Sequence, residues 1–355
     1  MKLLIVNHRD PFHPKAGGAE RDLLETFSRL VKKGVDVYWL SEDVGRGPGE
    51  VSGIHLIRRG NPLTLHFRSL LEATKFDLVF DSVAHAVPFL SNLVNRCTVA
   101  KIHHVHQQVL RYELPPHLAV PVAWAERLSR FYKRVIVPSR STGEEAVRTL
   151  KVRPERITVI PEGIDHSSYT PGEKSDEPFI LWLHRMKRYK NPLHAIEVFR
   201  LAKGRGLRGV KLVVAGGGDL ESQVREEAKR VEGVEVLGRV GEERKRELLR
   251  RAWLFMSTSF IEGWGLSVLE ANASGTPAVG YRVGSLGEII VEGVNGYTVP
   301  YGDLNKMADL LVNLFNDQRR LRAMWSSAYL ESLKYDWEKT AEMYHEFIER
   351  LECIK

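Results

Sequence analysis

A glycine-rich segment at residues 259–271 (SFIEGWGLSVLEA) contains the residues best suited to bind a ligand. Its glycines let the backbone approach a ligand closely, and the first amides of the helix expected at residues 266–274 would face a bound anion. Glu262 precedes this helix and Glu270 lies on it. Because each carboxylate can accept two hydroxyls, the segment predicts a site for a phosphate flanked by hydroxyl-bearing groups, which is the layout of a sugar nucleotide.

A cluster of positive charge follows the hydrophobic run at residues 179–183. It contains four cationic side chains within six positions, namely Arg185, Lys187, Arg188 and Lys190. Arginine can bind two phosphate oxygens at once and lysine acts as a point charge, so the cluster predicts contacts with a diphosphate. The structural alternative is a basic loop before a helix, and we expect Lys187 and Arg188 to be solvated.

Three histidines, His103, His104 and His106, follow the hydrophobic run at residues 97–102. Alternate residues of an extended chain share a face, so His104 and His106 raise the alternative of a metal site. The sequence offers no clear set of further ligands beside them. We therefore expect no metal here and no cofactor elsewhere, and a structural histidine remains an alternative to a site residue.

Taken with its glycines and its expected helix, the segment at residues 259–271 resembles the retaining glycosyltransferases of family 4, which have the two-domain GT-B fold. Their signature is two glutamates separated by seven residues. The resemblance implies that Glu262 contacts hydroxyls of the transferred sugar and that Glu270 contacts the ribose of the nucleotide. The chain departs from the family at Glu162, where Asn is common, so no polar role is expected there.

The same resemblance assigns the other candidate residues. It implies that Arg185 and Lys190 bind the donor diphosphate and that His103 hydrogen-bonds the donor sugar near the reacting carbon. Gly17 and Gly18, between the first predicted strand and its helix, would bring amides to the diphosphate when the domains close. The remaining donor-binding candidates are Gly216, Gly238, Val240, Gly263, Trp264, Gly265 and Leu266.

Two series of hydrophobic runs predict the elements that position these residues. The first series of predicted strands lies at residues 2–7, 35–40, 76–80, 97–102, 135–139 and 157–161. After a polar linker at residues 169–178, the second series lies at residues 179–183, 211–215, 234–237, 254–256 and 277–280. Helical stretches separate the runs, which is typical of parallel, doubly wound sheets.

The expected fold class is therefore α/β, and the resemblance specifies GT-B, with two doubly wound Rossmann-like domains facing an inter-domain cleft. The acceptor-side domain would span residues 1–168, and the nucleotide-sugar-binding domain residues 176–334. By resemblance alone, a terminal helix at residues 337–355 would cross back to the first domain.

Composition agrees with a globular enzyme of 355 residues, with 43% hydrophobic and 27% charged residues. The sequence has no apolar stretch long enough to cross a bilayer and no basic-then-apolar leader, so a cytoplasmic location is expected. Cys97 and Cys353 lie far apart and lack any metal-ligand or redox spacing, so neither is a site candidate.

The net charge of +7 is concentrated in the first half of the chain. Residues 1–170 have 24 Lys and Arg against 18 Asp and Glu, while residues 171–355 have 28 against 27. A helix is predicted at residues 121–134, with four aromatic or aliphatic side chains beside four cations. We hypothesise that it docks on an anionic membrane surface, the alternative being that its apolar stripe packs on the sheet. No nucleic-acid-binding pattern is present.

Together these features predict a retaining, metal-independent glycosyltransferase that moves a hexose-type sugar from a nucleoside-diphosphate donor to a hydroxyl of a carbohydrate or lipid-linked acceptor. Three alternatives bind similar ligands. They are a sugar-nucleotide epimerase of the GT-B fold, a phosphorylase, and a non-catalytic nucleotide-sugar-binding subunit. The nucleotide base, the sugar and the acceptor do not follow from the sequence.

Overall fold

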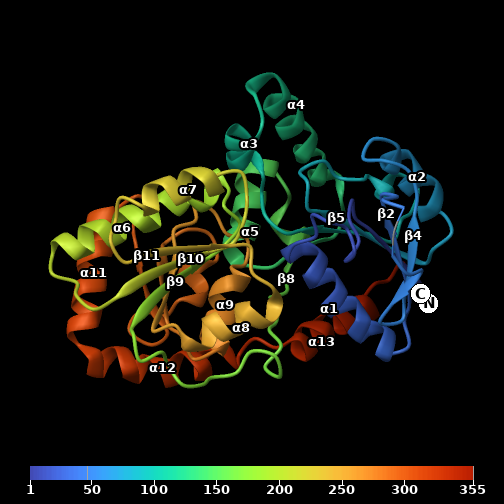
Figure 1. The fold of residues 1–355 in the computed structure, drawn as a ribbon. Helices are drawn as coiled ribbons and strands as arrows, with labels where there is room; N and C mark the ends of the chain where they lie inside the picture. The colour runs from blue at the N-terminus through green and yellow to red at the C-terminus, as the bar shows by residue number, and fades with distance from the viewer. Residues whose placement is uncertain (46, 355) are drawn as a thin grey trace. The chain divides into compact units, whose positions relative to one another are not determined.

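The computed structural model describes residues 1–45 and 47–354, which form two compact units (Figure 1). The first unit comprises Met1–Gly163 and Tyr335–Lys355, and the second comprises Ile164–Lys334. The linker expected at residues 169–178 lies within the second unit, because the Tyr169 hydroxyl donates to Glu270 and the Lys174 ammonium donates to Thr276. Each unit has its own sheet and core.

The described part of the first unit has an eight-stranded sheet in the order β3-β4-β2-β1-β5-β6-β7-β8. Its strands pair in parallel except for the short antiparallel pair of β3 and β4. The strands are β1 (Lys2–Val6), β2 (Asp36–Ser41), β3 (Glu50–Val51), β4 (Ile54–Arg58), β5 (Leu78–Val83), β6 (Thr98–Ile102), β7 (Val135–Val137) and β8 (Ile157–Val159).

Most helices of this unit connect its parallel strands, and α13 comes from the C-terminal segment of the chain. They are α1 (Gly18–Lys32), α2 (Thr64–Ala73), α3 (Gln107–Glu113), α4 (Pro116–Glu126), α5 (Arg140–Glu145) and α13 (Trp337–Glu349), with short helices at Ser91–Leu93, Arg127–Phe131, Ala146–Leu150 and Pro154–Arg156. Helix α13 packs on α1, where Arg29 bonds Glu338, and places Tyr344 in the core beside Phe27.

The second unit has a parallel sheet of six strands in the order β11-β10-β9-β12-β13-β14. Its strands are β9 (Phe179–Leu183), β10 (Lys211–Ala215), β11 (Val234–Gly238), β12 (Leu254–Ser257), β13 (Ala278–Tyr281) and β14 (Gly296–Val299). Its helices are α6 (Pro192–Gly204), α7 (Glu221–Ala228), α8 (Glu242–Arg251), α9 (Leu266–Ala273), α10 (Leu286–Ile289), α11 (Leu304–Asn316) and α12 (Gln318–Ser332), with a short helix at Arg188–Lys190.

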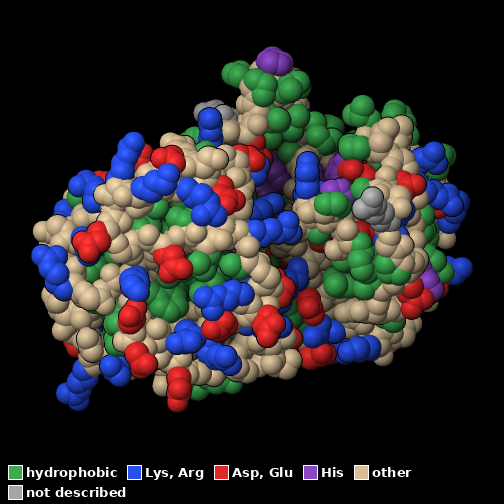
Figure 2. Space-filling view, in the orientation of Figure 1, with side chains coloured by type: hydrophobic (Ala, Val, Ile, Leu, Met, Phe, Trp, Pro, Cys, Tyr) green, Lys and Arg blue, Asp and Glu red, His purple; other side chains and the backbone are tan. Residues whose placement is uncertain are grey.

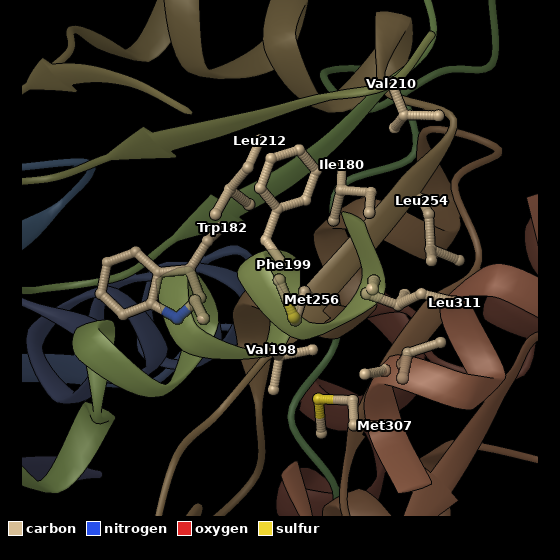
Figure 3. Close-up of a cluster of buried hydrophobic side chains, with 14 of the residues drawn as sticks. Ile180, Trp182, Val198, Phe199, Val210, Leu212, Leu254, Met256, Met307 and Leu311 are labelled. Atoms are coloured by element: carbon tan, nitrogen blue, oxygen red, sulfur yellow. The ribbon is translucent and has the colours of Figure 1, made fainter. Parts of the chain in front are cut away.

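The strand order reverses within each sheet, which puts helices on both faces because crossovers are right-handed. In the second unit α6, α7 and α11 lie on one side of the sheet, and α8, α9 and α12 lie on the other (Figure 1). Figure 3 shows the core on the α6 and α11 side, where Trp182, Phe199 and Met256 pack with Leu311. Trp182 and Met256 come from hydrophobic runs that the sequence predicted as buried strands, whereas Phe199 and Leu311 come from α6 and α11.

The helix predicted at residues 121–134 is wrong in its bounds. Helix α4 ends at Glu126 and a short 3-10 helix continues to Phe131. The backbone becomes extended at Tyr132, a fully buried residue whose hydroxyl donates to Asp81. Among the described residues, no helix is long and apolar enough to span a membrane.

Cys97 and Cys353 form a disulfide across a sequence separation of 256 residues. It joins the residue before β6 to the segment after α13. The spacing of the two cysteines gave no indication of this pair, because only the return of α13 to the first unit brings them together.

Candidate functional site

In both sheets the strand order reverses between two neighbouring strands, and polar residues follow those strands. The reversal lies between β9 and β12 in the second unit, and between β1 and β5 in the first. Ligands of open α/β sheets bind beyond the carboxyl ends of the strands at such a reversal. In the second unit, the loops that leave this point are residues 184–191 and 258–265, which contain Arg185, Lys190 and Glu262.

Glu262 and Lys190 form a half-buried ion pair that joins the two loops. The Lys190 Nζ lies 2.5 Å from Glu262 Oε1, and Ser259 Oγ donates to the same oxygen at 2.7 Å. Burial alone would raise the pKa of Glu262, but the charge of Lys190 and these hydrogen bonds lower it below its usual value. Glu262 is therefore an anion that can accept hydroxyl hydrogens.

The other cations of residues 184–191 have separate environments. Arg185 is exposed, and its guanidinium donates to the Tyr189 hydroxyl at 3.2 Å. Arg188 is also exposed, and Lys187 forms a surface ion pair with the exposed Asp219 at 2.6 Å. Arg185 thus has the freer cationic group beside the paired Lys190.

The glycine-rich turn before α9 is held by the loop after β13. Gly265 caps α9 in the left-handed region with φ of 90°, which a side chain would strain. Ser285 donates its backbone N–H to the Glu262 carbonyl and its hydroxyl hydrogen to the Trp264 carbonyl. Trp264 is buried, while Gly263 and Leu266 are half-buried. Ser285 was not a candidate from the sequence, because nothing local links it to this turn.

Glu270 is buried on α9 between two partners from distant segments. Its Oε1 lies 2.8 Å from Lys245 Nζ on α8 and accepts the Tyr169 hydroxyl hydrogen at 3.0 Å. Burial would lower the pKa of Lys245, but the charges of Glu270, Tyr169 and Glu242 raise it above its usual value. Lys245 and Tyr169 were not candidates from the sequence, because they lie 25 and 101 residues from Glu270 and no local pattern links them to it.

The two glycine candidates on neighbouring strands have structural reasons to be glycine. Gly216 has φ of 123°, and an added Cβ would lie 1.9 Å from the His184 carbonyl oxygen. Gly238 ends β11 with φ of 73°, opposite a register shift after Val214. Val240 follows it and is half-buried. Gly216 therefore lets the loop after β10 pack against the loop that contains Arg185.

His103, in the first unit, is buried where β6 ends. Its Nε2 lies 3.0 Å from Ser82 Oγ, and its Nδ1 lies 3.4 Å from Asp22 Oδ2. Burial and then the charges of Lys101, His106 and His85 hold the pKa of His103 well below its usual value, so the imidazole is neutral. A neutral imidazole offers one donor and one acceptor, which suits a hydrogen bond to a hydroxyl.

Gly17 and Gly18 stand where the loop after β1 enters α1. Gly17 is the N-cap of α1, and its N–H donates to Glu20 Oε2 at 2.7 Å. Glu20 also accepts from the Asn7 side chain at 2.9 Å. The sequence left open whether this pair is a turn or an anion cradle. The capping contact supplies a structural reason for the turn and occupies the Gly17 amide.

The histidine pair considered as a metal site has protein partners. His106 bonds the buried Glu126 through Nδ1 and the Ala84 carbonyl through Nε2. In the described residues, the group with the spacing for a metal ion is Asp22, His103 and Glu162. The ammonium of Lys101 already lies 2.6 Å from Asp22 Oδ2 and supplies positive charge there.

Two family models match the chain and together cover nearly all of it. The model for glycosyl transferases group 1 matches residues 166–330, and the model for glycosyltransferase family 4 matches residues 16–168. Relatives include a D-inositol 3-phosphate glycosyltransferase from Nocardia farcinica, 30% identical over 59% of this chain and 51% of that protein. The putative glycosyltransferase EpsF from Bacillus subtilis is 26% identical over 74% of this chain and 75% of that protein. The chain spans about half the length of several curated relatives it matches.

Solved structures resemble the whole chain in fold. Sucrose-phosphate synthase from Thermosynechococcus elongatus has a TM-score of 0.81 at 19% identity and covers 100% of both chains. HepE from Anabaena, solved with UDP-glucose, has a TM-score of 0.76 at 20% identity, covering 99% of this chain and 100% of that one. With two reversing parallel sheets, Glu262 before α9, Glu270 on it and family models over both halves, this chain belongs to the family 4 glycosyltransferases of the GT-B fold.

Proposed function

We propose that this protein is a retaining glycosyltransferase that transfers a hexose-type sugar from a nucleoside diphosphate to an acceptor hydroxyl. The observation that carries the proposal is the convergence of Arg185, Lys190 and Glu262 where the sheet of the second unit reverses. Cations there can stabilise the leaving diphosphate, and an anionic carboxylate can hold sugar hydroxyls. Glu270 would bind the ribose, and His103 would hydrogen-bond the sugar. Gly18 would contact the diphosphate, and Gly17 would do so only if its N–H leaves Glu20.

The first experiment identifies the donor and the reaction. Thermal shifts with UDP, GDP, ADP and TDP select the base, because a ligand of the folded state raises its melting temperature. Transfer assays with the matching sugar nucleotides follow, and inositol phosphate belongs among the acceptors because relatives are named for it. Release of nucleoside diphosphate only when an acceptor is present supports transfer. Binding without turnover would favour a non-catalytic subunit, and a requirement for inorganic phosphate would favour a phosphorylase.

Two further experiments test the stereochemistry of the product and the metal requirement of the reaction. Proton NMR should show that the new glycosidic bond has the anomeric configuration of the donor, and an inverted product would exclude retention. We propose that Arg185 and Lys190 supply the positive charge at the diphosphate. Activity should therefore survive EDTA, and a loss restored by a divalent ion would contradict this role.

We also propose that the first unit docks on an anionic bilayer and takes a lipid-linked acceptor. Its exposed apolar side chains on and near α4 include Leu118, Val120, Trp124 and Phe131, which are 49–67% exposed. Arg127 and Arg130 stack on Trp124 and Phe131, respectively. Aromatic rings beside cations suit the interface between headgroups and acyl chains.

Helix α2 presents a second apolar stripe in the same unit. Leu63, Phe67 and Leu71, four residues apart, are 80%, 74% and 69% exposed. Figure 2 shows hydrophobic side chains gathered over both α4 and α2. Such stripes with adjacent cations support a peripheral membrane association. A charged sugar nucleotide does not cross a bilayer unaided, so we place the enzyme in the cytoplasm, on the inner face of the membrane.

Vesicle sedimentation tests this docking. The protein should bind vesicles of phosphatidylglycerol but not of phosphatidylcholine, and salt should weaken binding. Changing Arg130 and Lys133 to Gln should reduce binding, and so should Trp124→Gln. The matched control changes Lys32 and Arg153, two exposed cations elsewhere in the unit, to Gln. Equal binding to both vesicles, or to neither, would favour a soluble acceptor.

A further inference from the structure

A buried cation lies directly behind His103. Lys101, on β6, is 1% exposed, and its Nζ lies 2.6 Å from Asp22 Oδ2 and 2.5 Å from the Tyr344 hydroxyl oxygen. Burial would lower the pKa of Lys101, but the charges of Asp22, Tyr344 and Glu162 raise it above its usual value. The buried lysine is therefore charged. Burial raises the pKa of Asp22, whereas the adjacent ammonium of Lys101 lowers it and favours the carboxylate that a buried ammonium requires.

Asp22 connects this ammonium to the imidazole. It is fully buried on α1, and its Oδ1 accepts the Thr26 hydroxyl hydrogen at 3.3 Å. Its Oδ2 lies between Lys101 Nζ and His103 Nδ1. Because Ser82 lies at the opposite ring nitrogen, the position of Asp22 limits how the ring of His103 can turn.

The chain crosses between its units at two places, and residues near both crossings lie beside Lys101, Asp22 and His103. The chain leaves the first unit directly after Glu162 and Gly163, and it returns at residue 335 to form α13 with Tyr344. An added Cβ on Gly163 would lie 2.3 Å from the Trp337 backbone nitrogen, so the two crossings pack backbone to backbone. Thr340 also bonds the Pro161 carbonyl at 2.9 Å.

We propose that Lys101 and Tyr344 are positioning residues, which hold Asp22 against the imidazole of His103 so that the returning helix α13 sets the orientation of the site histidine. The proposal rests on the proposed function, in which His103 contacts the transferred sugar. The ammonium and the hydroxyl act through Asp22 and do not touch the substrate. This role would explain why Lys101 is buried among the hydrophobic residues of β6.

The test compares two side chains one turn apart on α13. Tyr344→Phe removes the hydroxyl and keeps the ring that packs on Phe27 and Phe80. It should lower kcat about 10-fold with the donor KM within about twofold, since small misplacements of reacting groups cost up to 100-fold in rate. Thr340→Val removes the side-chain bond of this helix to the Pro161 carbonyl, which does not involve Lys101, and should leave kcat and the ring signals unchanged.

The ¹⁵N signals of the His103 ring give a readout that does not need turnover. They should shift in Tyr344→Phe and in Lys101→Met, and they are assigned by their loss in His103→Gln. Lys101→Met should lower kcat about 100-fold, and Lys101→Arg should restore part of it because it keeps the charge. If Lys101→Met does not fold, Tyr344→Phe decides by itself.

Two results would overturn the proposal. One is an unchanged kcat and unchanged His103 signals in Tyr344→Phe, with only a lower melting temperature, since Tyr344 would then merely fasten α13. The other is a loss of kcat in Thr340→Val as large as that in Tyr344→Phe. If the unchanged protein transfers no sugar, the proposed function fails, while the ring signals still decide whether Lys101 and Tyr344 position His103.

Discussion

At the scale of single residues, the site candidates of the second unit are already held by protein partners. Glu262 bonds Lys190 and Ser259, and Glu270 bonds Lys245 and Tyr169. Such contacts fix the rotamers of the carboxylates before a ligand arrives, which lowers the entropy cost of binding. Truncation of either glutamate therefore leaves a largely buried lysine without its carboxylate partner.

Arg185 is the simplest residue to test because it is exposed and its side chain bonds only Tyr189 among the described contacts. Arg185→Ala should lower kcat by about 10²–10³, corresponding to roughly 2.7–4 kcal/mol for a lost charge-stabilising donor. The melting temperature should change little. Steady-state kinetics with the natural donor check this.

The matched control for Arg185 is Arg188→Ala, which removes an exposed arginine from the same loop. It should keep near-normal turnover. Equal losses in the two variants would point to the net charge of the loop rather than to one guanidinium. A near-normal rate in Arg185→Ala would exclude its diphosphate role.

Glu270 should contribute to both nucleotide affinity and folding. Glu270→Ala removes a carboxylate partner of the ribose, and a hydrogen bond to a charged group contributes about 1.5–3 kcal/mol. It also leaves the Lys245 ammonium buried without this carboxylate, which costs roughly 3–5 kcal/mol in the free energy of unfolding. Calorimetric titration with nucleoside diphosphate and thermal melting measure the two effects.

Two further variants separate these effects. The double variant Glu270→Gln, Lys245→Gln avoids the unpaired ammonium and should recover stability while affinity stays low. Tyr169→Phe removes a neutral donor to the same oxygen and should retain most of the affinity. Unchanged nucleotide affinity in the double variant would make Glu270 a structural partner of Lys245.

At the scale of elements, helix α13 is fastened to the first unit along its length. Thr340 bonds the Pro161 carbonyl near its start, Tyr344 bonds Lys101 in its middle, and the disulfide of Cys97 and Cys353 follows its end. Each contact joins residues far apart in sequence. The first unit is therefore completed by the chain that returns to it after residue 334.

The disulfide should contribute substantially to the stability of the first unit. Replacing Cys97 and Cys353 with Ser should lower its unfolding free energy by about 2–5 kcal/mol, because closing a long loop restricts the unfolded chain. Thermal melting of the oxidised protein, the reduced protein and the double variant checks this. Equal melting temperatures in all three would show that packing of α13 suffices without the covalent bond.

At the scale of the whole molecule, both units contain buried histidines that must stay neutral. Burial and then Lys190 lower the pKa of His184 to about 3, and burial and then Arg9 lower that of His8 to about 4. In the unfolded chain both titrate near 6.5. Below that pH the unfolded state binds more protons, so stability is lost as the pH falls toward the folded pKa values.

The melting temperature should therefore fall as the pH decreases from about 6.5 to 4.5, with each such histidine contributing about 1.4 kcal/mol per pH unit. Asp81 opposes this trend, since burial raises its pKa to about 6 and favours the folded state at lower pH. Replacing His184 with Gln should flatten the dependence. A melting temperature independent of pH down to 4.5 would show that these histidines protonate without unfolding.

The sequence by itself determined the α/β class, the approximate strand positions and the glycine turn before α9. These features are local, because hydrophobic runs, glycines at positive φ and a helix stop at Gly275 act within a few residues. The sequence did not predict the pair of β3 and β4 or the strand β14. Strand β3 has only two residues, and β14 is a short segment, GYTV, without a strong hydrophobic pattern. Family resemblance supplied the residue roles, which remain predictions.

Only the tertiary structure decided which side chains meet. Lys190 reaches Glu262 because the strand order reverses between β9 and β12, and that reversal is not encoded in any local pattern. Lys101 meets Tyr344 and Cys97 meets Cys353 because the chain returns to its first unit after the second. The ammonium groups of Lys190 and Lys101 are stable away from water only when paired, and the fold brings their partners from distant segments.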